Sequence, residues 1–178
     1  MEYLSPYSVT KAMVALHDLM ASKAFRQGTS FGIISSAMTA LGISLSEWSS
    51  NGQLKAIVSS IIGLSISNAL ADGFSLYMSD RATGHERRGF VSGSIVSVIE
   101  FIFPYLFLVP FLLFSRTTAI VINAVLGVVL VSATGLAIAK TQGRTDKQIV
   151  EDQILYIGAT LVIMVLTYIG GKVASKLV

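Results

Sequence analysis

Long apolar runs dominate the pattern along the chain. Five of them, separated by short polar connections, extend from Gly28 to Leu45, Ala56 to Met78, Gly89 to Phe114, Thr118 to Ala139 and Ile154 to Ile169. Each approaches the ~20 residues that a helix needs to cross ~30 Å of hydrocarbon. Open backbone is not tolerated in lipid, and the short alternating segments of a β-barrel are missing from the sequence. The pattern predicts an all-α integral membrane protein, a bundle of five transmembrane helices.

The segment before the first apolar run has a different period. Val9, Met13, Leu16 and Met20 recur at steps of three and four, and Ser8 is a suitable N-cap. This predicts an N-terminal amphipathic helix, either lying in the headgroup interface or extending the first span into the cytoplasm. We therefore expect residues 1–27 to form this segment and residues 28–178 to form a single five-span domain.

Composition agrees with a lipid environment. Hydrophobic residues make up 53% of the 178 residues and charged residues only 13%, whereas soluble domains carry roughly 25% charged residues. The mean hydropathy is +0.71. The absence of cysteine excludes disulfides and thiolate metal sites. The net charge of +3 is small and the basic residues lie in short clusters between the spans, which argues against nucleic-acid binding.

The basic residues predict the orientation of the spans. Nine fall in the N-terminal segment, the second connection and the fourth connection: Lys11, Lys23, Arg26, Arg81, Arg87, Arg88, Lys140, Arg144 and Lys147. Four fall on the other side: Lys55, Arg116, Lys172 and Lys176. Because cytoplasmic loops carry the excess of Lys and Arg, the N-terminus is expected in the cytoplasm and the C-terminus on the opposite side.

Polar residues inside the spans are the candidates for function. Three spans each carry a polar seam, a row of polar or small residues on one helical face. The seam of the second span is Ser65, Asn68, Asp72, Ser75 and Ser79. The seam of the first span is Ser35, Thr39, Gly42 and Ser46, and that of the third is Ser97 and Glu100. Exposing these polar side chains to lipid hydrocarbon would be energetically unfavourable, so we expect the three seams to face one another. A charge at mid-membrane costs about 3 kcal/mol on insertion scales, so Asp72 and Glu100 indicate an ion pathway or a proton carrier. The alternatives are a neutral carboxyl satisfied by its neighbours and a carboxyl that reaches the membrane interface.

Other positions have structural interpretations. Pro104 and Pro110 are expected to kink or break the third span. The GxxxG pair of Gly28 and Gly32 predicts close helix packing, within the chain in preference to a dimer contact. Asp80 adjoins Arg81 and is expected to be a solvated charge at the end of the second span. The sequence has no metal-protease motif, no phosphate loop and no Ser–His arrangement, so we do not expect an enzyme.

The stretch ADGFSLY, ending at Tyr77 and followed by MSDRA, resembles the end of the second span in the vacuolar iron transporter family. Members of this family exchange divalent metals for protons across five spans. The resemblance extends from about Arg26 onward through Glu100, the LVPF segment at Pro110, and Gly143 with Arg144. It implies a homodimer and a transported metal as substrate, with no resident cofactor.

The chain departs from the family pattern at the ion site. Gln27 stands where the family has its first-span aspartate, Asp72 where it has a methionine, and Leu76 where it has a glutamate. The long acidic insert of plant-type members is replaced by residues 81–88. The resemblance therefore implies a metal site whose carboxylate has moved from the first span to the second.

The expected site is rich in oxygen ligands: Asp72, Glu100, Gln27, Asn68 and Ser75. Such ligands favour Mn²⁺, Mg²⁺ or Ca²⁺ and leave Fe²⁺ open. The leading interpretation is export of divalent cations similar to Fe²⁺ or Mn²⁺ from the cytoplasm, in exchange for protons. Two alternatives remain: a channel or carrier for another small ion or solute, and a membrane adaptor that transports nothing.

Overall fold

The computed structural model describes residues 18–177, and this part of the chain is helical with no strand. The elements are α2 (Lys23–Ser49), α3 (Leu54–Ala82), α4 (Glu86–Ile102), the 3₁₀ helix η1 (Phe103–Phe107), α5 (Val109–Leu113), α6 (Arg116–Thr141) and α7 (Asp146–Leu177). The amphipathic helix predicted from Ser8 lies mostly outside the described residues. Residues 18–21 are helical, and Ser22 then caps α2 by accepting the Phe25 N–H at 3.1 Å.

The five predicted spans are confirmed as five helices long and apolar enough to cross a membrane. These extend over Lys23–Ser49, Leu54–Ala82, Glu86–Leu113, Arg116–Thr141 and Asp146–Leu177. The third combines α4, η1 and α5. The first begins at Lys23, so the expected boundary at residue 28 falls inside α2. Helix length and hydropathy follow from local sequence, which is why the spans could be identified without a structure.

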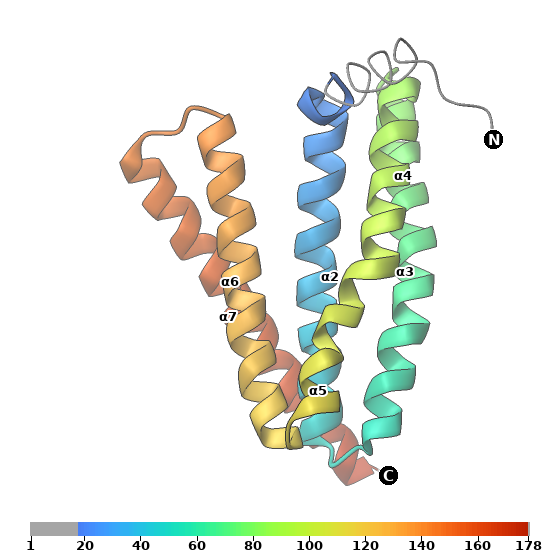
Figure 1. The fold of residues 1–178 in the computed structure, drawn as a ribbon, viewed down its shortest axis with the longest axis vertical. Coiled ribbons are helices and arrows are strands. Elements are labelled where there is room, and N and C mark those ends of the chain that lie inside the picture. Colours follow the sequence, from blue (N-terminus) through green and yellow to red (C-terminus); the bar gives the residue numbers. More distant parts are fainter. Residues whose placement is uncertain (1–17, 178) are drawn as a thin grey trace, which may run out of the picture.

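Helix α2 occupies the centre of the bundle. The α3–α4 hairpin packs on one side of it and the α6–α7 hairpin on the other (Figure 1). The start of α2 and the α3–α4 and α6–α7 connections lie at the same end, which we call the basic end. Its described basic residues are Lys23, Arg26, Arg81, Arg87, Arg88, Lys140, Arg144 and Lys147. The C-terminus lies at the opposite end.

The third span is broken, as its prolines predict. Helix α4 ends at Ile102, and the chain continues through η1 and α5 with Pro104 and Pro110 in their first turns. Proline cannot donate the helical hydrogen bond, so carbonyl groups near the break need other partners. Asn123 of α6 is fully buried, and its Nδ2 donates to the Phe107 carbonyl at 2.8 Å. This hydrogen bond connects the broken part of the third span to α6.

Glycines allow the helices of the α2–α4 and α3–α4 pairs to approach closely. A Cβ added to Gly28 would lie 2.6 Å from the Ser92 carbonyl oxygen, and one added to Gly32 would lie 3.0 Å from Ile99 Cβ. The GxxxG pair therefore packs within the chain against α4, which confirms the intramolecular interpretation. Gly73 of α3 and Gly93 of α4 are in direct backbone contact, since a Cβ on either would meet the carbonyl of the other.

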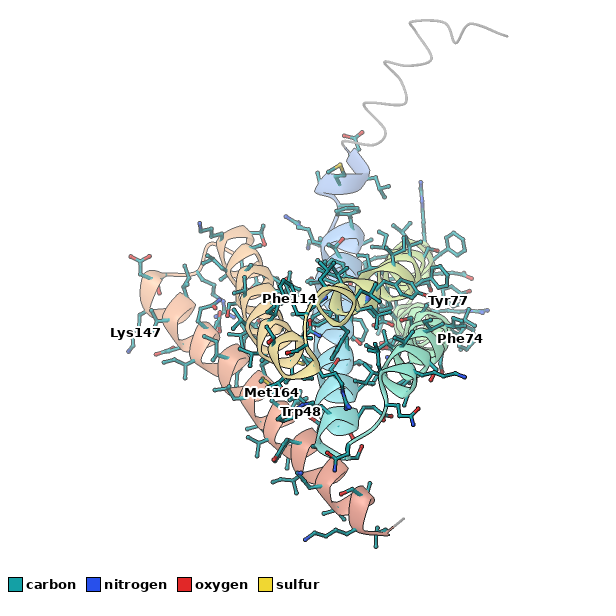
Figure 2. All side chains as sticks on the ribbon, turned by 60° about the horizontal axis from the view of Figure 1, so that its bottom comes forward. Trp48, Phe74, Tyr77, Phe114, Lys147 and Met164 are labelled. Carbon is teal, nitrogen blue, oxygen red and sulfur yellow. The ribbon has the colours of Figure 1, made fainter. Side chains whose placement is uncertain are left out.

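An apolar core joins the two hairpins at the end opposite the basic end. It consists of the buried residues Leu45, Ile57, Ile61, Leu108, Phe111, Ala119 and Ile120. Many large apolar side chains elsewhere point away from the bundle, as Phe74 does on α3 (Figure 2). In water such a surface would drive aggregation, whereas in a bilayer it faces lipid tails.

The expectation of a solvated charge at Asp80 was wrong. Asp80 is only 4% exposed, and its carboxylate accepts hydrogen bonds from the Arg88 guanidinium and from Ser92 Oγ. The hairpin turn brings the first turns of α4 back over the end of α3, so the partner is Arg88 and not the adjacent Arg81. This ion pair connects α3 and α4 at the basic end.

Candidate functional site

Parts of the three polar seams meet where α2, α3 and α4 surround a common interior, whereas Gly42 and Ser46 of the first-span seam lie against α7. Ser35 Oγ of α2 donates to Asp72 Oδ2 of α3 at 3.2 Å. The Glu100 carboxyl of α4 lies beside both Ser35 and Asp72. One turn further from the basic end, Asn68 Nδ2 donates to Thr39 Oγ1 at 3.5 Å. The structure thus brings two carboxyl groups together with hydroxyl and amide groups from three helices.

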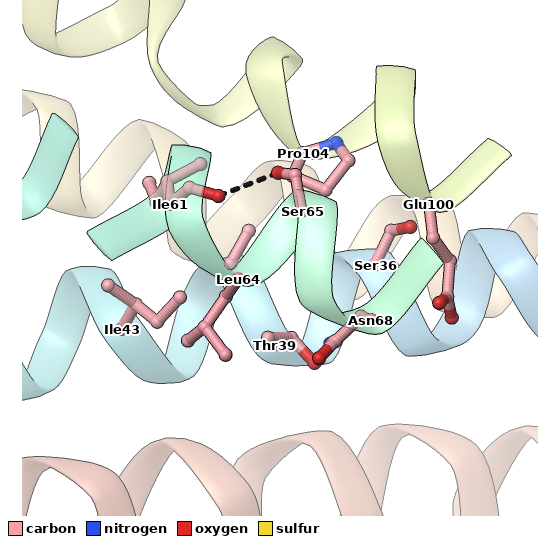
Figure 3. Close-up of a pocket in the computed structure, with 10 residues that line it drawn as sticks. Ser36, Thr39, Ile43, Ile61, Leu64, Ser65, Asn68, Glu100 and Pro104 are labelled. Atoms are coloured by element: carbon pink, nitrogen blue, oxygen red, sulfur yellow. Dashed lines mark hydrogen bonds between the residues drawn. The ribbon is translucent and has the colours of Figure 1, made fainter. Parts of the chain in front are cut away.

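A small cavity continues this polar interior. It is lined by Ser36, Thr39, Ala40, Ile43, Ile61, Leu64, Ser65, Asn68, Glu100 and Pro104, which come from α2, α3, α4 and η1 (Figure 3). Its volume is about 10 Å³, comparable to the space needed for one water molecule. The polar members lie toward Glu100, while Ile43 and Ile61 close the other end next to the apolar core.

Glu100 is the unusual residue of this interior. It is 1% exposed, and neither of its carboxyl oxygens makes a well-aligned hydrogen bond with a residue among 18–177, although the Ser35 hydroxyl and the Asp72 carboxyl lie beside it. The neighbouring Ser36 hydroxyl also lacks one. Residue 104 is proline, so it cannot supply the N–H that would normally bond the Glu100 backbone carbonyl. Buried polar groups without partners are costly and rare, which indicates a site that gains its partners from a ligand, water or proton.

The site lies deep relative to the basic end. Asp72 precedes Arg81 by nine residues and Glu100 follows Arg88 by twelve, which correspond to about 14 and 18 Å of helix. Half of the ~30 Å hydrocarbon layer is ~15 Å. Both carboxyl groups therefore lie near the middle of a membrane-sized bundle. Asp72 is half-buried, whereas Glu100 is enclosed, so the site is more open at Asp72.

The predicted site residues do not all belong to this group. Asp72, Glu100 and Asn68 come together, whereas Ser75 is exposed on α3. Gln27 lies eight residues before Ser35, about 12 Å nearer the basic end along α2. Ser35 is the residue across from Asp72. It was part of the first-span seam in the sequence, but the seam alone could not show which of its members faces the carboxylate.

The donor set favours hard cations. Among the described residues, no group of three or more His, Cys, Asp or Glu side chains could hold a metal ion. A cation between Asp72 and Glu100 would therefore complete its shell with the Ser35 hydroxyl or water. These are oxygen ligands, of the kind that Mg²⁺, Ca²⁺ and Mn²⁺ prefer over thiolate or imidazole sites.

Comparison of the chain with protein-family models, with curated proteins and with solved structures gives no match.

Proposed function

We propose that this protein is a membrane transporter that moves a divalent cation out of the cytoplasm in exchange for protons. The cation would bind between Asp72 and Glu100, with Ser35 and Asn68 completing the polar interior. The observation that carries the proposal is the deeply buried Glu100 carboxyl, which lies beside a second carboxyl and makes no well-aligned hydrogen bond within the described chain.

Charge balance supports exchange with protons. Two carboxylates in a low-dielectric interior repel each other, and a proton bound between them relieves that repulsion. A divalent cation would neutralise both carboxylates and displace that proton. Loading with a cation and loading with protons are then mutually exclusive, which is the requirement for exchange.

Export also requires the site to open alternately to each side. Asp72 is half-buried, and Ser75 and Ser79 are exposed on the same helix nearer the basic end. Beyond the cavity, the apolar core around Ile57, Ile61 and Phe111 closes the other side. This arrangement supports ion entry from the basic end. It also leaves polar side chains exposed at membrane depth, which supports a homodimer in which a second copy covers them.

The transport proposal is tested by Mn²⁺ uptake into proteoliposomes, with and without a pH gradient. We expect uptake to depend on the gradient. Equal Mn²⁺ uptake with and without the pH gradient would favour a channel or an uncoupled carrier. If the folded protein takes up none of Mn²⁺, Fe²⁺ and Mg²⁺, the alternative of a membrane adaptor that transports nothing would be favoured.

Orientation is tested by labelling single cysteines, which is clean because the chain has none of its own. With the basic end in the cytoplasm, a His85→Cys variant should resist a membrane-impermeant thiol reagent added to intact cells. Gln53→Cys, in the α2–α3 connection at the opposite end, is the matched control and should react. Both positions are exposed, so the reverse pattern of labelling would show that the orientation is inverted.

Glu100→Gln separates proton coupling from cation binding. The amide keeps the hydrogen-bonding shape of the side chain but cannot titrate. We expect the variant to retain cation binding better than it retains pH-driven uptake. The measurement is Mn²⁺ binding to the purified protein beside uptake across a pH gradient. An equal loss of both would make Glu100 mainly a ligand, and an unchanged pH dependence would remove it from the coupling mechanism.

A further inference from the structure

A groove separates α2 from α6 near the basic end. The two helices pack together toward the opposite end and diverge toward the basic end (Figure 1). The groove has a volume of about 360 Å³ and is lined by Met20, Phe25, Arg26, Thr29, Ser30, Ile33, Ala133, Thr134, Ala137, Ile138 and Thr141. Of these lining residues, Arg26 alone is charged. In a bilayer, an apolar groove of this size between two spans is filled by another molecule.

Polar groups line the groove on both helices, with Arg26, Thr29 and Ser30 on α2 and Thr134 and Thr141 on α6. Arg26 is exposed and forms no ion pair with another described residue. Thr29 follows one turn later, and its Oγ1 is buried without a hydrogen-bond partner among residues 18–177. Deeper in the groove, Ile33 and Ala133 present only apolar atoms. The groove therefore offers a cation at its mouth, hydroxyl groups next to it, and mainly apolar side chains deeper between the helices.

The dimensions fit one chain of a lipid. From Arg26 to Ile33 the helix rises about 10 Å, which is most of the ~15 Å depth of one leaflet. Arg26 lies at the start of the first span, where headgroups meet hydrocarbon. A ligand matching this order of groups has an anionic head, a hydrogen-bond acceptor next to it, and an acyl chain.

We propose that the groove binds an anionic phospholipid. Its phosphate would pair with Arg26, an ester carbonyl would accept the Thr29 hydroxyl, and one acyl chain would lie along Ile33, Ala133 and Ala137. This site is separate from the carboxyl pair, which lies among α2, α3 and α4. The inference depends on the helices being in a membrane and does not depend on transport.

The test is native mass spectrometry of the full-length protein, purified in detergent with equal amounts of phosphatidylglycerol and phosphatidylcholine. The wild type should retain phosphatidylglycerol in preference. Arg26→Gln should lower that retention about fivefold, the effect of one basic residue at a membrane surface. Arg87→Gln is the matched control, because Arg87 is an exposed arginine of the basic end that lies outside the groove, and it should leave retention unchanged.

A second pair of variants tests the apolar part of the groove. Ala137→Phe fills the groove and should reduce retention of both lipids, whereas Val121→Phe, at an exposed position at the other end of α6, should not. Equal retention of the two lipids by the wild type, or equal effects of Arg26→Gln and Arg87→Gln, would overturn the proposal. A lipid-free dimer that Ala137→Phe dissociates would instead assign the groove to a second copy of the chain.

Discussion

Asp72→Asn is expected to lower metal-dependent uptake by more than about tenfold while the protein remains folded. The substitution removes one of the two charges that would hold a divalent cation, and that loss is large in a low-dielectric interior. The shape of the side chain is kept, and the amide oxygen can still accept the Ser35 hydroxyl. The measurement is Mn²⁺ uptake in proteoliposomes, with size-exclusion chromatography to check that the variant stays folded and keeps the oligomeric state of the wild type.

Glu151→Gln is the matched control for this substitution. Glu151 is exposed on α7 and its ion pair with Lys147 is a solvated one, so neutralising it should leave uptake unchanged. Undiminished Mn²⁺ uptake by the Asp72→Asn protein would contradict the assignment of the ion site to Asp72. Loss of the oligomer together with uptake would instead indicate that Asp72 holds subunits together, as the adaptor alternative requires.

Gly93→Ala is expected to be the most destabilising small substitution in the α3–α4 hairpin. The added methyl group would meet the carbonyl oxygen of Gly73, which belongs to the backbone of the facing helix and cannot rotate away. Overpacking of this kind costs about 1–3 kcal/mol, and a backbone clash belongs at the upper end. This corresponds to a lower melting temperature by roughly 10 °C for a domain of this size.

Thermal unfolding in detergent, followed by circular dichroism, measures this effect. Gly63→Ala is the matched control, because Gly63 is also helical and a Cβ there would meet nothing within 4 Å. Alanine has the higher helix propensity, so the control should match or exceed the wild type in stability. Because Gly73 directly follows Asp72, a shifted α3–α4 contact should also weaken uptake. Equal melting temperatures for the two variants would show that the close contact is not required.

Sequence alone was sufficient for the properties that depend on local pattern. The five spans follow from the lengths of the apolar runs, and the broken third span follows from the missing N–H groups of Pro104 and Pro110. The pairing of Gly28 and Gly32 against α4 also agreed with the intramolecular interpretation. For the spans and the break, the physical cause lies within one helix or within a few residues of it, whereas the partner helix of the glycine pair was identified only by the structure.

Tertiary structure decided the contacts between helices. Periodicity placed Ser35, Asp72 and Glu100 on polar seams, but the axial offset between helices determines that Ser35 faces Asp72 while Gln27 lies about 12 Å away along α2. The crossing of α3 over α4 leaves Ser75 exposed, and the hairpin turn buries Asp80 against Arg88. These outcomes depend on how helices cross and where glycines let them touch, which the period of a single helix does not specify.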